Sequence, residues 1–159
     1  MAPVSPLFLR DEELERALHL LWLSELELMN IGLRVLEPRG LSAKDYLLLF
    51  LVGRRPGTTM AELTRPLATS KQALSRHVIK LRELGLLEER SSGLDRRTKP
   101  LQLTPAGREL LDAALAQQKR RLKRAFRTAG ADAVSGFLRL LECILEERGQ
   151  MLAAAGGSV

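Results

Sequence analysis

The amino-acid sequence predicts a mainly α-helical protein with one small β-hairpin, and three observations support this fold class. Apolar residues recur at helical spacing through two long segments, one toward each end of the chain. Between them, three helix-start signals follow one another closely, from residue 42 to residue 72. Two short apolar segments then flank a polar turn that contains a glycine, which is typical of a hairpin.

The composition is that of a single globular domain. The chain has 159 residues, enough for one hydrophobic core, and is 45% apolar and 28% charged. Its longest apolar run, "YLLLFLV" at 46–52, is too short to cross a bilayer, and the first residues do not resemble a secretory signal. The single cysteine, Cys143, excludes a disulfide within the chain, so a cytoplasmic protein is expected.

Charge is distributed unevenly along the chain. The net charge is +6, but residues 1–30 carry −4, residues 39–131 carry +12 and residues 132–159 carry −2. A strongly basic middle segment between acidic ends favours a polyanionic partner for that segment. A basic surface that is only solvated would give the same pattern, so charge alone leaves both interpretations open.

The first long helix is expected over residues 7–36. Ser5 and Pro6 suit its cap and first turn, and "EPRG" at 37–40 ends it. Its apolar stripe is broad for a helix that packs on one side only.

Three shorter helices are expected next. Ser42 begins the first, in "SAKDYLLLFLV", and "GRRPG" ends it. "TMAE" at 59–62 is a capping box that begins the second, in which Pro66 should bend the helix or end it early. "TSKQ" at 69–72 repeats the capping box and begins the third, which Gly85 ends.

A β-hairpin and two long helices complete the expected structure. Residues 87–90 and 101–104 have strand character, and the basic turn "SSGLDRR" lies between them. Thr104 and Pro105 then cap and open a long helix that continues through "KRRLKRAFR", and a last helix covers about 132–153. Two closely joined helices followed by a hairpin form a winged helix-turn-helix, here set between long terminal helices.

The stretch "SKQALSRHVIKL" (70–81) has the most informative chemistry. On a helix over 70–84, Leu74, Val78 and Leu81 share one buried face. The opposite face suits base edges in a DNA major groove, because Arg can bind guanine, Gln can bind adenine and Ile can contact a thymine methyl. This outward face consists of Gln72, Ser75, Arg76, Ile79 and Lys80, and Ser70 and Lys71 at the helix N-terminus suit phosphate. A merely solvated face is the alternative, but an exposed isoleucine among donors fits it less well.

Residues 70–110 resemble the winged-helix core of the MarR family of bacterial transcriptional regulators. "LRELGLLEER" is similar to the end of that family's recognition helix and its first wing strand, and "LQLTPAGREL" to its second strand and next helix. "DRR" (95–97) is similar to the family's wing-tip Asp-x-Arg. The long terminal helices extend the resemblance to nearly the whole chain. Within the family, "FLRDEELERAL" and the opening of helix 70–84 look closest to a branch similar to the PetP regulators.

This resemblance implies a homodimer that binds double-stranded DNA. Residues 7–37 and 105–153 would form the dimer, and residues 41–104 the DNA-binding lobe. The recognition helix would enter the major groove, and the wing at 91–99 would enter the flanking minor groove. Arg97 would be the wing arginine, oriented by Asp95, and Arg96 would contact phosphate. An arginine on a narrow tip also suits the negative potential of a narrow minor groove.

In this family small-molecule effectors often bind between the dimer helices and the DNA lobe. The resemblance implies four wall residues for such a pocket, His19, Trp22, Met29 and Tyr46. Core or dimer contacts explain the same four residues equally well.

Other chemistry is scarce in the sequence. Cys143 lies among apolar residues and is expected to be buried and inert. His19 and His77 lack partners at ligand spacing, so neither a metal nor a cofactor is expected. No glycine-rich phosphate loop or Ser/His/Asp constellation is visible, which argues against an enzyme. The basic run at 119–127 is interpreted as solvated, with contacts to phosphate or an acidic partner as the alternative.

Together these observations predict a dimeric, sequence-specific transcriptional regulator, a repressor modulated by a small-molecule ligand. The alternatives are a nonspecific architectural DNA binder and a winged-helix module that binds protein. The outward Gln72, Ser75 and Arg76 favour sequence recognition, since nonspecific binding needs only phosphate contacts.

Overall fold

The computed structural model describes residues 7–90 and 100–146. After a 3-10 turn at Leu7–Leu9, the helices α1 (Asp11–Leu36), α2 (Ala43–Arg54), α3 (Met60–Thr64) and α4 (Lys71–Glu83) follow in order, with a second 3-10 turn at Glu37–Arg39. The antiparallel strands β1 (Leu87–Glu89) and β2 (Leu101–Leu103) lead to α5 (Pro105–Ala129) and α6 (Ala131–Glu146). The predicted fold class, mainly helical with one hairpin and long terminal helices, is confirmed. No helix in the described ranges is both long and apolar enough to span a membrane.

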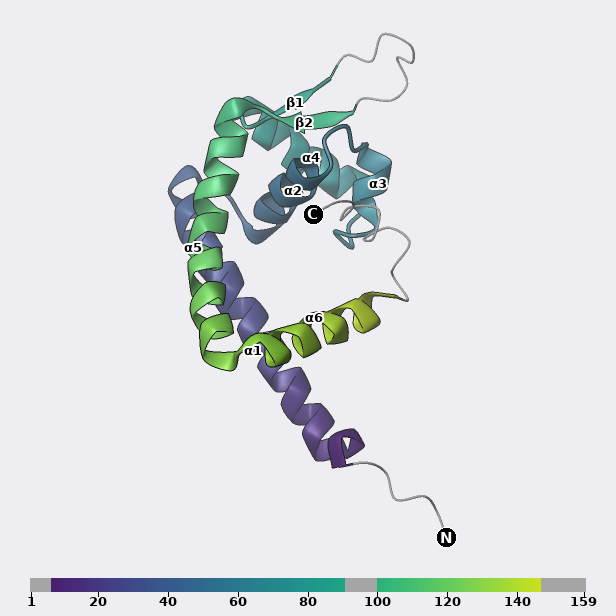
Figure 1. Cartoon of the computed structure of the whole chain (residues 1–159). Coiled ribbons are helices and arrows are strands. Elements are labelled where there is room, and N and C mark those ends of the chain that lie inside the picture. Colours follow the sequence, from purple (N-terminus) through teal and green to yellow (C-terminus); the bar gives the residue numbers. More distant parts are fainter. Residues whose placement is uncertain (1–6, 91–99, 147–159) are drawn as a thin grey trace.

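The helices and the hairpin divide into two regions (Figure 1). α2, α3, α4 and the hairpin gather at one end, where α5 begins. From there α5 runs beside the second half of α1, and the first half of α1 extends beyond the rest of the molecule. α6 runs to one side from the end of α5 and crosses α1 in this view. The apolar core lies within the first region and against the first half of α5; its fully buried side chains include Leu36, Leu48, Leu49, Leu63, Leu74, Leu81, Leu86, Leu101 and Leu111.

Local signals place most helix starts correctly. The Ser42 hydroxyl caps α2 by accepting from the Asp45 amide at 3.3 Å, and the Thr104 hydroxyl caps α5 by accepting from the Gly107 amide at 3.0 Å. At α3, the Thr59 amide donates to the Glu62 carboxylate at 2.8 Å, as expected for a capping box.

Two predicted helix starts are corrected. α1 begins at Asp11, because residues Leu7–Leu9 form a separate 3-10 turn; Ser5 and Pro6 lie outside the described residues. At α4 the cap is Ser70, whose hydroxyl accepts from the Ala73 amide at 3.2 Å, and the predicted capping box from 69 to 72 does not form. The cap is therefore one residue further along the chain.

Helix ends also follow the local chemistry. α3 ends at Thr64, two residues before Pro66, which confirms the early end predicted from that proline. Gly85 ends α4 with a φ of +67°, a left-handed conformation that glycine adopts without strain. Both strands are one residue shorter than predicted. The predicted last helix is confirmed as far as Glu146, and the rest of it lies outside the described residues.

Candidate nucleic-acid interface

The outward face of α4 is the main candidate surface. Leu74, Val78 and Leu81 are buried, which confirms the predicted inward stripe. On the other side Gln72 and Arg76 are exposed, and Ile79 is 50% exposed. An aliphatic side chain this exposed on the same face as a glutamine and an arginine supplies the mixture of donors and apolar contact that base edges in a major groove require.

The N-terminal end of α4 suits a phosphate group. Ser70 and Lys71 are both exposed there, and α4 carries no acidic residue in its first turn. Free amide groups and the helix dipole make a helix N-terminus favourable for an anion, and the Lys71 ammonium adds a full positive charge.

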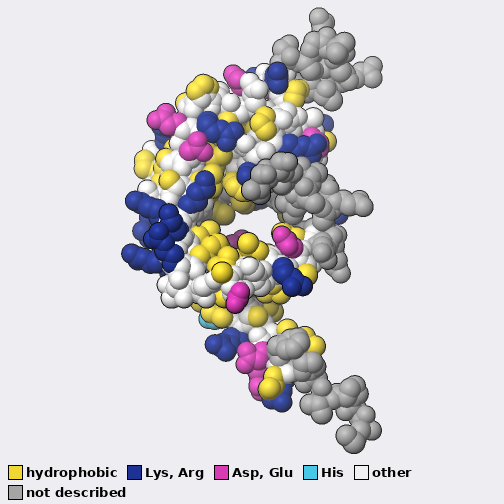
Figure 2. Space-filling view, in the orientation of Figure 1, with side chains coloured by type: hydrophobic (Ala, Val, Ile, Leu, Met, Phe, Trp, Pro, Cys, Tyr) yellow, Lys and Arg dark blue, Asp and Glu magenta, His cyan; other side chains and the backbone are white. Residues whose placement is uncertain are grey.

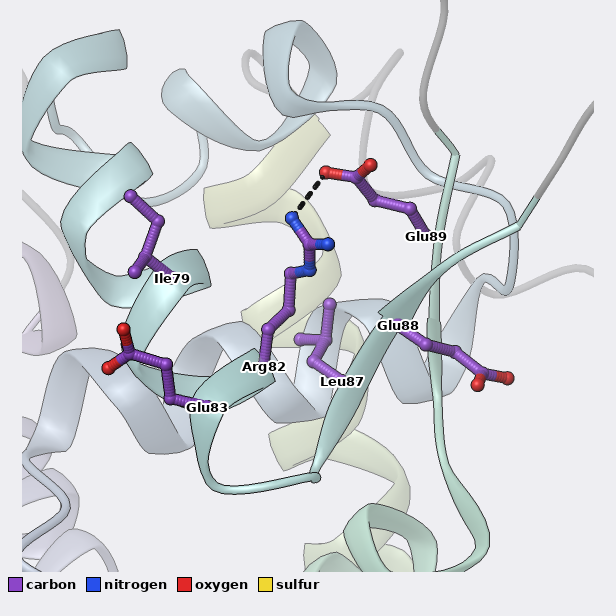
Figure 3. A pocket seen from close by; sticks show the side chains of 6 residues that line it. All are labelled: Ile79, Arg82, Glu83, Leu87, Glu88 and Glu89. Carbon is purple, nitrogen blue, oxygen red and sulfur yellow. Dashed lines mark hydrogen bonds and ion pairs between the residues drawn. The ribbon is translucent and has the colours of Figure 1, made fainter.

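The C-terminal half of α4 borders an acidic groove. Figure 3 shows its lining side chains, Ile79, Arg82, Glu83, Leu87, Glu88 and Glu89, which come from α4 and β1. Arg82 forms an ion pair with Glu89 at 2.9 Å, so its charge is already compensated. Carboxylates repel DNA phosphates, so residues 70–79, which include Lys71 and Arg76 and no carboxylate, are the part of α4 suited to DNA.

The two strands of the hairpin form the base of the wing, which is joined to the segment before α3. Glu88 pairs with Gln102 in the antiparallel register, and the Arg90 amide donates to the Pro100 carbonyl at 2.8 Å. A bridge between Thr58 and Leu101 ties β2 to the segment before α3. The predicted wing-tip residues Asp95, Arg96 and Arg97 lie outside the described residues.

A cluster of polar side chains surrounds Asp45 and was not predicted from the sequence. This carboxylate is 0% exposed, and its Oδ1 lies 2.7 Å from His77 Nδ1. Its Oδ2 accepts from the Ser42 amide at 2.8 Å and from Lys80 Nζ at 2.9 Å. The "SAKD" pattern marks Asp45 as a capping residue, but its partners on α4 are 32 and 35 residues away and give no local signal.

The Lys80 side chain does not behave as predicted. It was expected on the outward face, but it is 40% exposed and its ammonium also donates to the Gly40 carbonyl at 2.6 Å. The long, flexible stem of lysine lets the ammonium reach around the helix to the buried carboxylate. Ser75 is likewise only half-exposed, so Gln72, Arg76 and Ile79 are the outward residues with free surface.

Asp45 should make the stability of the protein sensitive to acid. Burial raises its pKa, but hydrogen bonds from the Ser42 amide, Lys80 and His77 outweigh burial and lower the pKa from 3.8 to about 2. A carboxylate with a lowered pKa contributes stability that is complete above its unfolded pKa and is lost as the pH falls toward the folded value. This shift corresponds to about 2 kcal/mol.

The expected result is a steeper loss of unfolding free energy between about pH 5 and pH 2 in the native protein than in Asp45→Asn. Urea unfolding at a series of pH values measures both slopes. Parallel slopes for the two proteins would contradict the assignment.

The four predicted effector residues do not share one environment in a single chain. Tyr46 is in the core, where its hydroxyl donates to Gln118 Oε1 at 2.6 Å. Met29 packs against the same core, whereas His19 is exposed and Trp22 is 64% exposed on α1.

Two further predictions concern the terminal helices. Cys143 was expected to be buried, which is wrong for the single chain: it is exposed on α6, where most of the large apolar side chains are also uncovered in one chain. In the basic run at 119–127, all six Lys and Arg side chains are exposed, as expected for a solvated face. Figure 2 shows basic side chains gathered along the outer side of α5.

Comparison with known proteins identifies the family. A sequence profile of the MarR family matches residues 39–98. The chain is 30% identical over 140 residues to the HTH-type transcriptional regulator PetP of Rhodobacter capsulatus, which covers 88% of this chain and 84% of that protein.

Two solved structures are similar over most of their length. The Mycobacterium tuberculosis MarR family protein Rv2887, in complex with salicylic acid, has a TM-score of 0.58 and 26% identity, covering 91% of this chain and 99% of that chain. FabT of Streptococcus pneumoniae, in complex with DNA, has a TM-score of 0.73 and 19% identity, covering 87% of this chain and 99% of that chain.

These matches agree with the fold described above, in which a helix-turn-helix and a hairpin lie between long terminal helices. The similarity to PetP extends well beyond the winged helix and confirms the resemblance first seen in residues 70–110. The chain therefore belongs to the MarR family of DNA-binding transcriptional regulators, a family of proteins that are not enzymes.

Proposed function

We propose that this protein is a homodimeric repressor that binds a pseudo-palindromic operator and responds to a small-molecule ligand. Helix 70–84 enters the major groove, and the wing at 91–99 enters the minor groove through Arg97, with Asp95 orienting it and Arg96 on phosphate. The observation that carries sequence specificity is the exposed set Gln72, Arg76 and Ile79 on a capped helix that carries no acid on that side before Glu83, its last residue. A nonspecific binder would not need an isoleucine there.

The proposed dimer rests on apolar surface that a single chain leaves uncovered. Figure 2 shows hydrophobic side chains gathered over α6 and the adjoining part of α1. The exposed large hydrophobic side chains of these two helices include Leu14, Leu18, Trp22, Leu23 and Leu26 on α1, and Leu138, Leu140, Ile144 and Leu145 on α6. An exposed apolar face of this extent is typical of an obligate interface. A two-fold dimer would present two copies of α4 to half-sites about one helical turn, roughly 10 base pairs, apart.

Ile144→Glu is expected to convert the dimer to a folded monomer of 17.7 kDa, because Ile144 is 54% exposed in one chain and a buried carboxylate at the interface would be costly. Sedimentation at micromolar concentration measures the mass. Ser135→Glu adds the same single negative charge at another exposed position of α6 and controls for that charge. A native protein that sediments as a 17.7 kDa monomer would contradict the dimer.

The experiment that tests the function is selection of bound sequences from a random duplex library. A specific regulator should yield a two-fold symmetric consensus and show its half-site spacing. A nonspecific architectural binder should yield none, and a protein-interaction module should bind no duplex at moderate salt.

Lys71→Ala is expected to weaken binding to the selected duplex and to a random duplex alike, because its ammonium neutralises phosphate at the N-terminus of α4. The slope of log affinity against log salt should become shallower by about one per half-site, or about two across the dimer. Affinities of both duplexes measured across a salt series test this. A loss confined to the selected duplex would instead assign Lys71 to base recognition.

The small-molecule response is proposed from the relative Rv2887, whose structure contains salicylic acid. In this chain the exposed His19 and Trp22 lie on the part of α1 that the proposed dimer would cover, whereas Tyr46 packs in the core of the same chain and Met29 against it. A pocket with these walls would be complete only in the dimer.

A further inference from the structure

The Asp45 cluster joins α2, α4 and the connection before α2 through the side chains of Asp45 and Lys80. Asp45 belongs to the first turn of α2, and His77 and Lys80 lie one turn apart on α4. Lys80 Nζ donates both to Asp45 Oδ2, at 2.9 Å, and to the Gly40 carbonyl, at 2.6 Å. Gly40 lies in the connection between α1 and α2, so α4 is tied both to α2 and to the segment that follows α1.

Capping of α2 does not account for this arrangement. Glu62 occupies the same position in the capping box of α3, and its side chain is 38% exposed, with Thr59 and the exposed Arg55 as its partners. Asp45 is instead 0% exposed and has two bonds to α4 in addition to its bonds to Ser42. A buried carboxylate is costly unless it is paired, and pairing one to two specific side chains fixes their geometry.

The two bonds lie on one flank of α4, next to the outward face. At about 100° per residue, His77 and Lys80 fall between the buried stripe at Leu74 and the outward Arg76. The apolar stripe alone is compatible with small rotations of α4 about its axis. Two polar bonds one turn apart oppose such rotations, and the rotation of α4 sets the direction in which Gln72 and Arg76 point.

We propose that Asp45 is a positioning residue for base recognition, which holds α4 at the rotation that aligns Gln72 and Arg76 with the base edges. The inference rests on the proposed function. Lys80 then acts within the protein as the partner of Asp45 and does not contact DNA.

The test compares Asp45→Asn, Lys80→Met and the double variant in the full-length protein. Affinities are measured for the duplex selected by the native protein and for a random duplex, across a salt series. Each single variant should bind the selected duplex at least about tenfold more weakly and the random duplex within about twofold of the native protein, with an unchanged salt slope, because sites tolerate misorientation of only about 10–20°. The double variant should bind the selected duplex no more weakly than the single variant that binds it less tightly, since both changes break the same bond.

Two further variants separate positioning from stability. Glu62→Gln weakens a capping box of the same type without touching α4, and it should leave the ratio of the two affinities unchanged. Lys80→Arg retains a cation that can reach Asp45. It should therefore keep most of the native protein's preference for the selected duplex over the random one. Circular dichroism and titration of the active fraction show that each variant is folded; if Asp45→Asn does not fold, the Lys80 variants alone decide.

Three outcomes would overturn the inference. The first is an unchanged ratio in Lys80→Met or in folded Asp45→Asn. The second is a salt slope in Lys80→Met that is shallower by about one per half-site, with weaker binding to both duplexes, which would make Lys80 a phosphate contact. The third is a native protein with no preference among duplexes, which would overturn the proposed function as well; the first two leave that function intact.

Discussion

Arg76→Ala is expected to weaken binding to the selected operator by about 1–3 kcal/mol per half-site, with little change on a random duplex. Arg76 is exposed near the middle of the outward face of α4. Its fork of donors matches the two acceptors on the major-groove edge of guanine, and alanine leaves that edge without a partner. In a dimer the loss occurs at both half-sites, which makes this the largest expected effect on function.

The measurement is the affinity of both duplexes for Arg76→Ala and for Arg127→Ala. Arg127 is also exposed and lies in the basic run of α5. Its substitution by alanine removes the same charge from a surface that is interpreted as solvated. Arg127→Ala should leave the ratio of the two affinities unchanged. If Arg76→Ala lowered both affinities equally, α4 would hold phosphate and would not recognise bases.

Gly107→Ala is expected to destabilise the fold by about 3 kcal/mol or more. A Cβ at position 107 would lie 1.9 Å from the carbonyl oxygen of Leu86, far inside contact distance. That oxygen belongs to the backbone between α4 and β1, and it accepts from the Thr104 amide at 3.2 Å. It cannot move aside without disturbing the junction of the recognition helix, the wing and α5.

Urea unfolding measures this effect, and Gly136→Ala is the matched control. Gly136 lies within α6, and a Cβ there would meet no atom within 4 Å. Alanine at that position should be neutral or stabilising, by up to about 1 kcal/mol, because of its higher helix propensity. Equal unfolding free energies for the two variants would refute the close-approach argument.

The sequence by itself determined the order of elements, most helix boundaries and the inward stripe of α4. Ser42, Thr104 and Gly85 act through bonds or backbone conformations that span three or four residues, so neighbouring letters are sufficient to predict them. Helical periodicity placed Arg76 and Gln72 outward for the same reason, since rotation along one helix is a local property.

Only the tertiary structure decided which partners the long side chains reach and which helix faces are covered. Lys80 was placed outward by its angle on α4, yet its ammonium bonds to Asp45, 35 residues earlier, because a buried carboxylate requires a cation or donors wherever the fold supplies them. Cys143 has apolar sequence neighbours but is exposed, because burial depends on which face of α6 meets another helix. Periodicity gives the direction of a Cβ atom, whereas the partner at the end of a flexible side chain is set by contacts between segments far apart in the chain.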